Sequence, residues 1–235
     1  MTQTPIRFGL FPKQKTALTS TATEVLYGGA AGGGKSHLMR VAAINWCTQI
    51  NGLQIYLFRR IRDDLIKTHL DSHNGFRNIL QPWVEDGYAT IVEEGIRFFN
   101  GSRIYLCHLG HPSEISKYLS TEINVLLIDE LTTFTEAMYR QLRARVRMVG
   151  IDVPEHLKGQ FPRILCGSNP GNVGHLFVKS TFIDGKEPLK IYQAPSEEGG
   201  MLRQYIPARV NDNPALMEQD PTYVDKLKGI GSDAL

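Results

Sequence analysis

One glycine-rich stretch, residues 27–40 (YGGAAGGGKSHLMR), restricts this chain more than any other part of the sequence. Gly29, Gly34, Lys35 and Ser36 occupy the fixed positions of the phosphate-loop pattern G-x-x-x-x-G-K-[ST]. The glycines let the backbone curl so that successive N–H groups point at one anion. The pattern therefore predicts a nucleotide site, with Lys35 on the β- and γ-phosphates of ATP and the Ser36 hydroxyl on Mg²⁺.

The sequence on either side of this loop supports the interpretation. Residues 24–27 (EVLY) are typical of a buried strand and residues 37–50 of a helix, so the loop joins a strand to a helix, as phosphate binding requires. The alternative is a glycine-rich surface turn that meets the pattern by chance. We expect an exposed loop, with the Lys35 side chain packed against no protein group. The predicted nucleotide-binding residues here are Gly29, Ala30, Ala31, Gly32, Gly33, Gly34, Lys35, Ser36 and His37.

Composition limits the class of protein. A chain of 235 residues with 42% hydrophobic residues has room for a real core in one large α/β domain, with or without a small appendage. No segment is long enough to span a bilayer, and the first residues lack the apolar core of a signal peptide. Three widely spaced cysteines favour reduced thiols in a cytosolic protein. With a net charge of +2, a nucleic-acid surface would have to come from local clustering.

Gln14 is a candidate for base recognition. It lies shortly before the first predicted strand, in a segment with nearby aromatic residues (residues 8–15, FGLFPKQK). Its amide can accept from and donate to the adenine edge while an aromatic ring stacks on the base. The alternative is an ordinary helix entry after Pro12.

A second buried strand is predicted at residues 53–58, followed by Arg59, Arg60 and Arg62. These arginines would lie at the carboxyl end of the strand, where open α/β sheets bind ligands. They are candidates for contacts to phosphate or DNA, and the alternative is a solvated helix start. We expect a helix over residues 63–80, closed by Pro82. Beyond it, short β runs at 88–92, 96–99 and 103–107 predict an antiparallel extension at the edge of the main sheet.

Asp129 and Glu130 form the second strong motif. They follow the apolar strand predicted at residues 125–128, in the sequence EINVLLIDE. A buried strand gains nothing from carboxylates at its tip, since burying them costs several kcal/mol unless they are paired or bound to metal. We expect Asp129 to hold Mg²⁺ or its water shell, and Glu130 to orient and deprotonate the attacking water. No Asn-Lys-x-Asp motif for guanine recognition is present in the sequence, which favours ATP over GTP.

Thr135 is predicted to cap a helix that carries four arginines at spacings that distribute them around its surface. Farther on, a third buried strand (residues 163–167) ends in Ser168 and Asn169. An amide at that position can sense the γ-phosphate, although Asn-Pro-Gly can also be a plain turn. Beyond residue 185 the sequence reads as irregular. We therefore divide the chain into an ATPase core at 1–185 and a small lid subdomain at 186–235.

Taken in this order, the motifs resemble the ATPase motor of tailed-phage large terminase subunits. The resemblance is carried by GGAAGGGKS (28–36), VLLIDE (125–130) and GSNPG (167–171), with support from FPKQ (11–14), LFRR (57–60) and VNDNP (210–214). It covers almost the whole chain. The first two motifs are shared by many strand-Glu (ASCE, RecA-like) P-loop ATPases, so the order and the last stretches point to terminase.

The resemblance implies a mainly parallel sheet flanked by helices and a Mg²⁺-dependent ATP hydrolase that pumps double-stranded DNA into a procapsid. It implies that Lys35 and Ser36 bind phosphate and Mg²⁺, that Asp129 holds the metal, that Glu130 activates water, and that Ser168 and Asn169 couple hydrolysis to movement. It also implies a homo-oligomeric ring docked on a portal, a small terminase subunit as partner, no membrane, and the host cytoplasm as location.

Two features depart from the family pattern. Complete large terminases continue into a nuclease domain, and this chain looks like the motor half alone. The family also needs an arginine at the site, and position 31 is Ala where some relatives carry Arg. The candidates are Arg59 as a catalytic residue, Arg143, Arg145, or a residue from a neighbouring subunit.

Two other functions fit parts of the sequence. A helicase-like or repair ATPase of the same class would normally add a second RecA-like domain, for which 235 residues leave no room. A nucleotide-gated assembly module would bind ATP and barely hydrolyse it, and it would have no use for Glu130.

Overall fold

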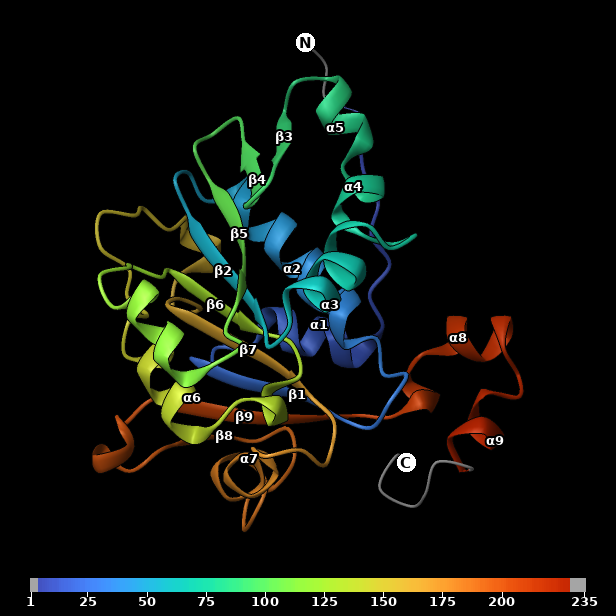
Figure 1. The fold of residues 1–235 in the computed structure, drawn as a ribbon, viewed down its shortest axis with the longest axis vertical. Helices are drawn as coiled ribbons and strands as arrows, with labels where there is room; N and C mark the ends of the chain where they lie inside the picture. The colour runs from blue at the N-terminus through green and yellow to red at the C-terminus, as the bar shows by residue number, and fades with distance from the viewer. Residues whose placement is uncertain (1–3, 229–235) are drawn as a thin grey trace.

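A computed structural model describes residues 4–228. Nine strands from these residues form one sheet in the order β3-β4-β5-β2-β6-β7-β1-β9-β8, with helices on both faces (Figure 1). The strands are β1 Glu24–Gly29, β2 Gln54–Arg59, β3 Ala89–Val92, β4 Gly95–Phe98, β5 Arg103–His108, β6 Val125–Ile128, β7 Arg163–Ser168, β8 Ile191–Gln193 and β9 Leu202–Ala208. The α/β class with a mainly parallel sheet is confirmed.

The helices vary widely in length. The α-helices are α1 Pro12–Thr19, α2 Lys35–Gln49, α3 Arg62–Leu65, α4 Phe76–Ile79, α5 Gln81–Glu85, α6 Glu136–Arg143, α7 His175–Phe182, α8 Pro214–Gln219 and α9 Tyr223–Lys228. Ile66–Leu70 is a π-helix, and short 3₁₀ helices lie at Pro112–Tyr118, Leu131–Thr133, Glu155–Leu157, Ser196–Glu198 and Val210–Asp212. The described residues include no helix with the length and apolarity that crossing a membrane requires.

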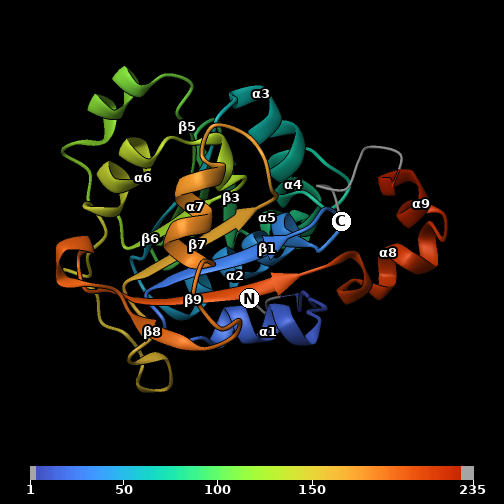
Figure 2. The ribbon, with the colours of Figure 1, turned by 90° about the horizontal axis from the view of Figure 1, so that it is seen from below.

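The sheet has a core on each face because successive side chains of a strand point to opposite sides. In β1, Val25 and Tyr27 pack toward α1 and α2, whereas Leu26 packs with α6 and α7. All four residues of β6 are buried, as expected for a parallel strand covered on both faces. Figure 2 shows α7 crossing one face of the sheet near β1 and β7.

Three parallel strands bring the predicted motifs together. β7 lies between β1 and β6, with Gly28 opposite Ser168 and Ile128 opposite Cys166. The residues that follow each strand therefore meet at the carboxyl edge of the sheet, which is the usual ligand-binding edge.

The predicted helix over residues 63–80 is wrong. The segment breaks into α3, the π-helix and α4, because the polar turn at residues 71–75 ends with Gly75, where a Cβ atom would lie 2.3 Å from the Leu70 carbonyl oxygen. Pro82 does not close a helix but lies in the first turn of α5, where its missing N–H costs nothing.

The boundary at residue 185 does not match the sheet. β9 pairs in parallel with β1 along the whole length of β1, and β8 pairs antiparallel with β9. Both strands therefore belong to the core sheet. The lid segment, which we define as residues 209–228, follows β9. Its helices α8 and α9 lie beyond the end of β9 in both views (Figures 1 and 2). The antiparallel β3–β4–β5 extension lies at the opposite edge of the sheet, as predicted.

Arg163 is a fully buried arginine that holds α1 against the start of β7. Its guanidinium donates to the carbonyl oxygens of Ala17, Leu18, Ser20 and Ala22, and it lies over the ring of Trp46. The contacts satisfy carbonyls that the end of α1 leaves without helical partners.

We expect Arg163→Met to lower the free energy of unfolding by about 2–4 kcal/mol, because it leaves several buried carbonyls without donors. The control is Arg97→Met on the exposed face of β4. Urea denaturation followed by circular dichroism measures both variants. Equal stability of the two would show that the Arg163 contacts contribute little.

Candidate nucleotide-binding and hydrolysis site

The predicted phosphate loop joins β1 to α2, and its glycines have structural reasons. Gly29, Gly32 and Gly34 have φ values of 120°, 75° and 73°, which favour glycine. A Cβ atom on Gly33 would lie 2.9 Å from the Cβ of Ala208. α2 begins at Lys35 with no side chain capping its first N–H groups. Free N–H groups and the positive end of a helix dipole are able to bind an anion, and here they lie at the carboxyl edge of the sheet.

Lys35 is buried, so the expectation that it packs against no protein group is wrong. Its Nζ donates to the carbonyl oxygen of Ala30 at 2.5 Å and to Oδ1 of Asn169 at 2.6 Å. Burial lowers the pKa of Lys35 to about 8, although the negative charges of Asp129 and Glu130 oppose the shift. These contacts place the lysine between the loop and the end of β7.

Asp129 and Ser36 lie together, as the predicted metal site requires. The Ser36 hydroxyl donates to Oδ2 of Asp129 at 3.0 Å, and the carboxylate is almost fully buried. Burial raises the pKa of Asp129, but the hydrogen bond from His69, the charge of Arg59 and the Ser36 hydroxyl outweigh it, and the pKa falls to about 2. A hydroxyl and an ionised carboxylate are ligands that suit Mg²⁺. The described residues contain no group of three His, Cys, Asp or Glu side chains that could hold a metal ion by themselves.

Glu130 has a backbone conformation that is rare for its residue type. Its φ of 61° and ψ of 54° lie in the left-handed region, where a non-glycine residue stores of order 1–3 kcal/mol of strain. The side chain is 41% exposed, in contrast to that of Asp129. The two adjacent carboxylates therefore have different environments, one buried and one facing solvent.

Arg59 lies against both carboxylates. Its Nη2 donates to Oε1 of Glu130 at 2.6 Å, and its Nε lies 3.3 Å from Oδ2 of Asp129. The other two arginines of the predicted cluster point elsewhere: Arg60 donates to the Leu109 carbonyl oxygen, and Arg62 pairs with Glu93. The structure thus places one arginine of this run at the site.

Arg143 and Arg145 lie toward the amino ends of the strands, away from the carboxyl edge, so they are wrong as candidates for this chain's own site. Arg143 bonds to Glu24, the first residue of β1, and to the Glu198 carbonyl oxygen. The backbone of Arg145 pairs with Ile123, just before β6. Thr135 caps α6 through Met138 N–H, as predicted.

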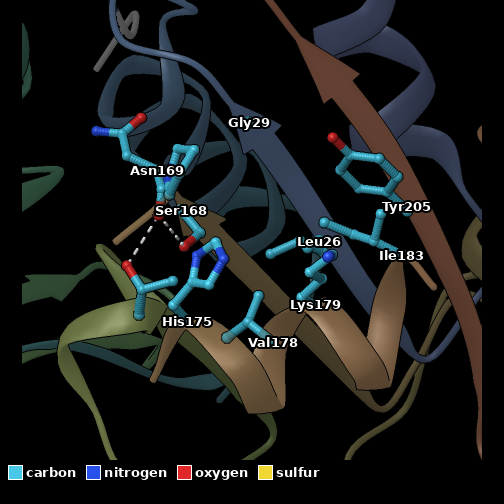
Figure 3. A pocket seen from close by; sticks show the side chains of 11 residues that line it. Leu26, Gly29, Ser168, Asn169, His175, Val178, Lys179, Ile183 and Tyr205 are labelled. Carbon is cyan, nitrogen blue, oxygen red and sulfur yellow. Dashed lines mark hydrogen bonds between the residues drawn. The ribbon is translucent and has the colours of Figure 1, made fainter. Parts of the chain in front are cut away.

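Ser168 and Asn169 arrive beside Asp129 and Glu130, as the strand order predicted. The carbonyl oxygen of Asn169 accepts from the hydroxyls of Thr132 and Ser168. The side chain of Asn169 accepts from Lys35. Figure 3 shows the Asn169 amide projecting away from Lys179 and Tyr205, which line a hollow of about 370 Å³ on the α7 side. Asn169 therefore connects the loop lysine with the β6 tip.

Gln14 is buried next to the loop, and the backbone engages both ends of its amide. Oε1 accepts from Phe11 N–H, and Nε2 donates to the carbonyl oxygen of Gly34. A cavity of about 450 Å³, lined by Phe11, Gln14 and Gly34 and by residues of the lid segment, lies beside it. His37 also lines this cavity, with Nε2 3.0 Å from the Gly9 carbonyl oxygen. The cavity has room for a base next to the phosphate loop.

Sequence reasoning missed two sets of residues at this site. His69 contacts Asp129 from the π-helix, inside the segment that we expected to be one regular helix. The lid segment reaches the loop, where Asn213 donates to the Gly32 carbonyl oxygen at 2.7 Å and a Cβ on Gly32 would meet Leu216 and Tyr223. The VNDNP stretch was a signal for the second set, whereas nothing in the sequence marked His69.

These features define the chain as a P-loop fold of the strand-Glu type, with β7 between the strand of the phosphate loop and the strand of the acidic pair. Phage packaging ATPases are among the solved structures with a similar fold. The large terminase of a thermophilic bacteriophage, in complex with ADP, superposes with a TM-score of 0.64 at 16% identity, over 93% of this chain and 50% of that chain. The ATPase domain of the Thermus phage P74-26 large terminase gives 0.58 at 14% identity, over 93% and 88%. The N-terminal domain of the bacteriophage phi29 DNA packaging ATPase gives 0.53 at 18% identity, over 84% and 96%.

The chain therefore has the fold of the ATPase domains of phage large terminases, and it spans about half the length of the ADP-bound terminase from the thermophilic phage. No protein-family model and no curated protein matches it.

Proposed function

We propose that this chain is the ATPase motor domain of a large terminase, which hydrolyses ATP with Mg²⁺ to move double-stranded viral DNA into a procapsid. The observation that carries the proposal is the meeting of Lys35, Ser36, Asp129, Glu130 and Asn169 at one edge of the sheet. A nucleotide-binding module without hydrolysis would need only the first three of these residues.

The proposed chemistry assigns a separate task to each group. Backbone N–H groups at the start of α2 and the Lys35 ammonium bind the β- and γ-phosphates. Ser36 and Asp129 would hold Mg²⁺, which would neutralise charge on the same phosphates. Glu130 orients water and takes its proton, and Asn169 reports on the γ-phosphate. Gln14 and the adjoining cavity hold the base.

Partners and location follow from the same proposal. A second structure of the thermophilic-phage terminase is a complex with ATP-gamma-S, and the phi29 packaging motor assembly also superposes on this chain, with a TM-score of 0.51 at 19% identity. We propose that this chain likewise forms a ring on a portal, works with a small terminase subunit, and acts in the host cytoplasm.

The proposal is tested by the ATPase rate with and without duplex DNA over a range of protein concentrations. We expect turnover that duplex DNA stimulates, and none in Lys35→Ala. A helicase or repair ATPase would instead respond to single-stranded or forked DNA and separate its strands. Binding of ATP with negligible turnover under all conditions would favour the assembly module.

We expect Asn169→Ala to leave ATP affinity nearly unchanged and to lower DNA-stimulated hydrolysis. The amide contacts Lys35 and would touch only the γ-phosphate or the attacking water, a small part of the binding surface. Affinity is measured by titration with a fluorescent ATP analogue and turnover by phosphate release. A variant with the turnover of the unmodified protein would make Ser168-Asn169 a plain turn.

A further inference from the structure

The proposed chemistry assigns no role to the π-helix at Ile66–Leu70, although this helix contacts the site. π-helices are rare and often occur at functional sites. Two consecutive residues of this one, Thr68 and His69, contact groups around the acidic pair. Both follow α3, which leads away from the carboxyl end of β2.

His69 is fully buried and faces Asp129. Its Nε2 lies 2.9 Å from Oδ2 of Asp129, the same oxygen that accepts from the Ser36 hydroxyl. An ionised carboxylate can only accept a hydrogen bond, so Nε2 of His69 is the donor and carries the hydrogen of the imidazole ring. Nδ1 of His69 is buried and has no hydrogen-bond partner among residues 4–228. The ring therefore makes one directed hydrogen bond, and that bond is to the carboxylate.

Thr68 connects the same turn to two arginines. Its hydroxyl accepts from Nη1 of Arg59 at 2.6 Å, and its carbonyl oxygen accepts from Nη1 of Arg40 at 3.0 Å. Arg59 holds Glu130, and Arg40 lies on α2, one turn beyond Ser36. The π-helix thus contacts the helix that follows the phosphate loop, the arginine on Glu130, and Asp129 itself.

We infer that His69 is a positioning residue for Asp129: it fixes the rotation of the carboxylate so that Oδ2 stays on Ser36 and the metal side of the site is preformed. This inference rests on the proposed function, since it assigns Asp129 to Mg²⁺. Side chains that orient metal ligands in this way typically contribute 10–100-fold to metal affinity or activity.

The test replaces His69 by Gln and by Asn, two amide side chains that differ in length by one methylene group. Gln places an amide nitrogen near the position of Nε2 and can still donate to Asp129, whereas Asn places it near the position of Nδ1, away from Asp129. His73→Asn, at an exposed histidine four residues on, is the matched control. Binding of a fluorescent ATP analogue is measured against Mg²⁺ concentration and again in EDTA.

We expect His69→Asn to raise the Mg²⁺ concentration at half-maximal binding 10–100-fold and to leave binding in EDTA unchanged. His69→Gln should recover most of the loss, and His73→Asn should match the unmodified protein. An unchanged Mg²⁺ midpoint in His69→Asn, or equal losses in both His69 variants, would overturn the inference. If the unmodified protein neither binds nor hydrolyses ATP, the proposed function fails instead, so the two failures are distinguishable.

Discussion

Arg59→Ala should lower ATP turnover by about 10³–10⁵-fold, the cost of losing an arginine that stabilises transition-state charge in phosphoryl transfer. Arg59 contacts Glu130, Asp129 and Thr68 together, so its guanidinium is fixed beside the place where the γ-phosphate would react. Arg62→Ala is the matched control, because that arginine belongs to the same run and is half-exposed. Single-turnover phosphate release measures the chemical step in each variant.

A mixing experiment asks in which chain Arg59 acts. Glu130→Gln protein keeps its arginines but lacks the carboxylate that we propose activates water. If Arg59 serves its own chain, adding this protein to Arg59→Ala should restore nothing. Recovery of activity on mixing would mean that Arg59 completes a neighbour's site, as an arginine supplied across a head-to-tail ring interface would. Turnover within tenfold of the unmodified protein would remove Arg59 from the mechanism.

Glu130→Gln should lower turnover by about 10²–10⁴-fold, the usual contribution of general acid–base catalysis, and still bind Mg·ATP. Gln has nearly the same shape, and the largely buried Arg59 guanidinium keeps the carboxylate of Asp129 as a charged partner 3.3 Å away. The fold should therefore be unaffected, and loss of the proton acceptor is the main change.

Asp129→Asn should behave differently, because Asp129 is buried and accepts from Ser36 and His69. We expect metal dependence and nucleotide affinity to weaken together in this variant. Mg²⁺ titrations of binding and turnover separate the two carboxylates. The assigned roles would be wrong if both variants lost affinity equally while Glu130→Gln kept its turnover.

The sequence predicted the parts of the site that local pattern controls. The turn between β1 and α2 forms because Gly29, Gly32 and Gly34 have positive φ values that favour glycine. The apolar run before Asp129 forms a buried strand because its side chains are removed from water on both faces of the sheet. The order of these elements predicted that Asn169 would lie near them.

What the sequence did not reveal depends on tertiary contacts. Lys35 looked exposed because one of its two partners, Asn169, becomes a neighbour only when β1 and β7 pair. His69 lies in a segment whose helical appearance concealed the break at Gly75. The strands β8 and β9 were missed because the residues around them are rich in Pro and Gly. They become strands through tertiary pairing, of β9 with β1 and of β8 with β9.

The position of β9 has a consequence for the synthesis of the protein. β1 carries the phosphate loop and is made among the first residues, but its neighbours in the sheet, β7 and β9, are made much later. Until residue 208 leaves the ribosome, one edge of β1 has no partner, and unpaired strand edges invite wrong pairing. We expect the nascent chain to stay unable to bind ATP until then. A nucleotide-affinity assay on stalled chains of increasing length should therefore show binding appear in one step after β9 emerges.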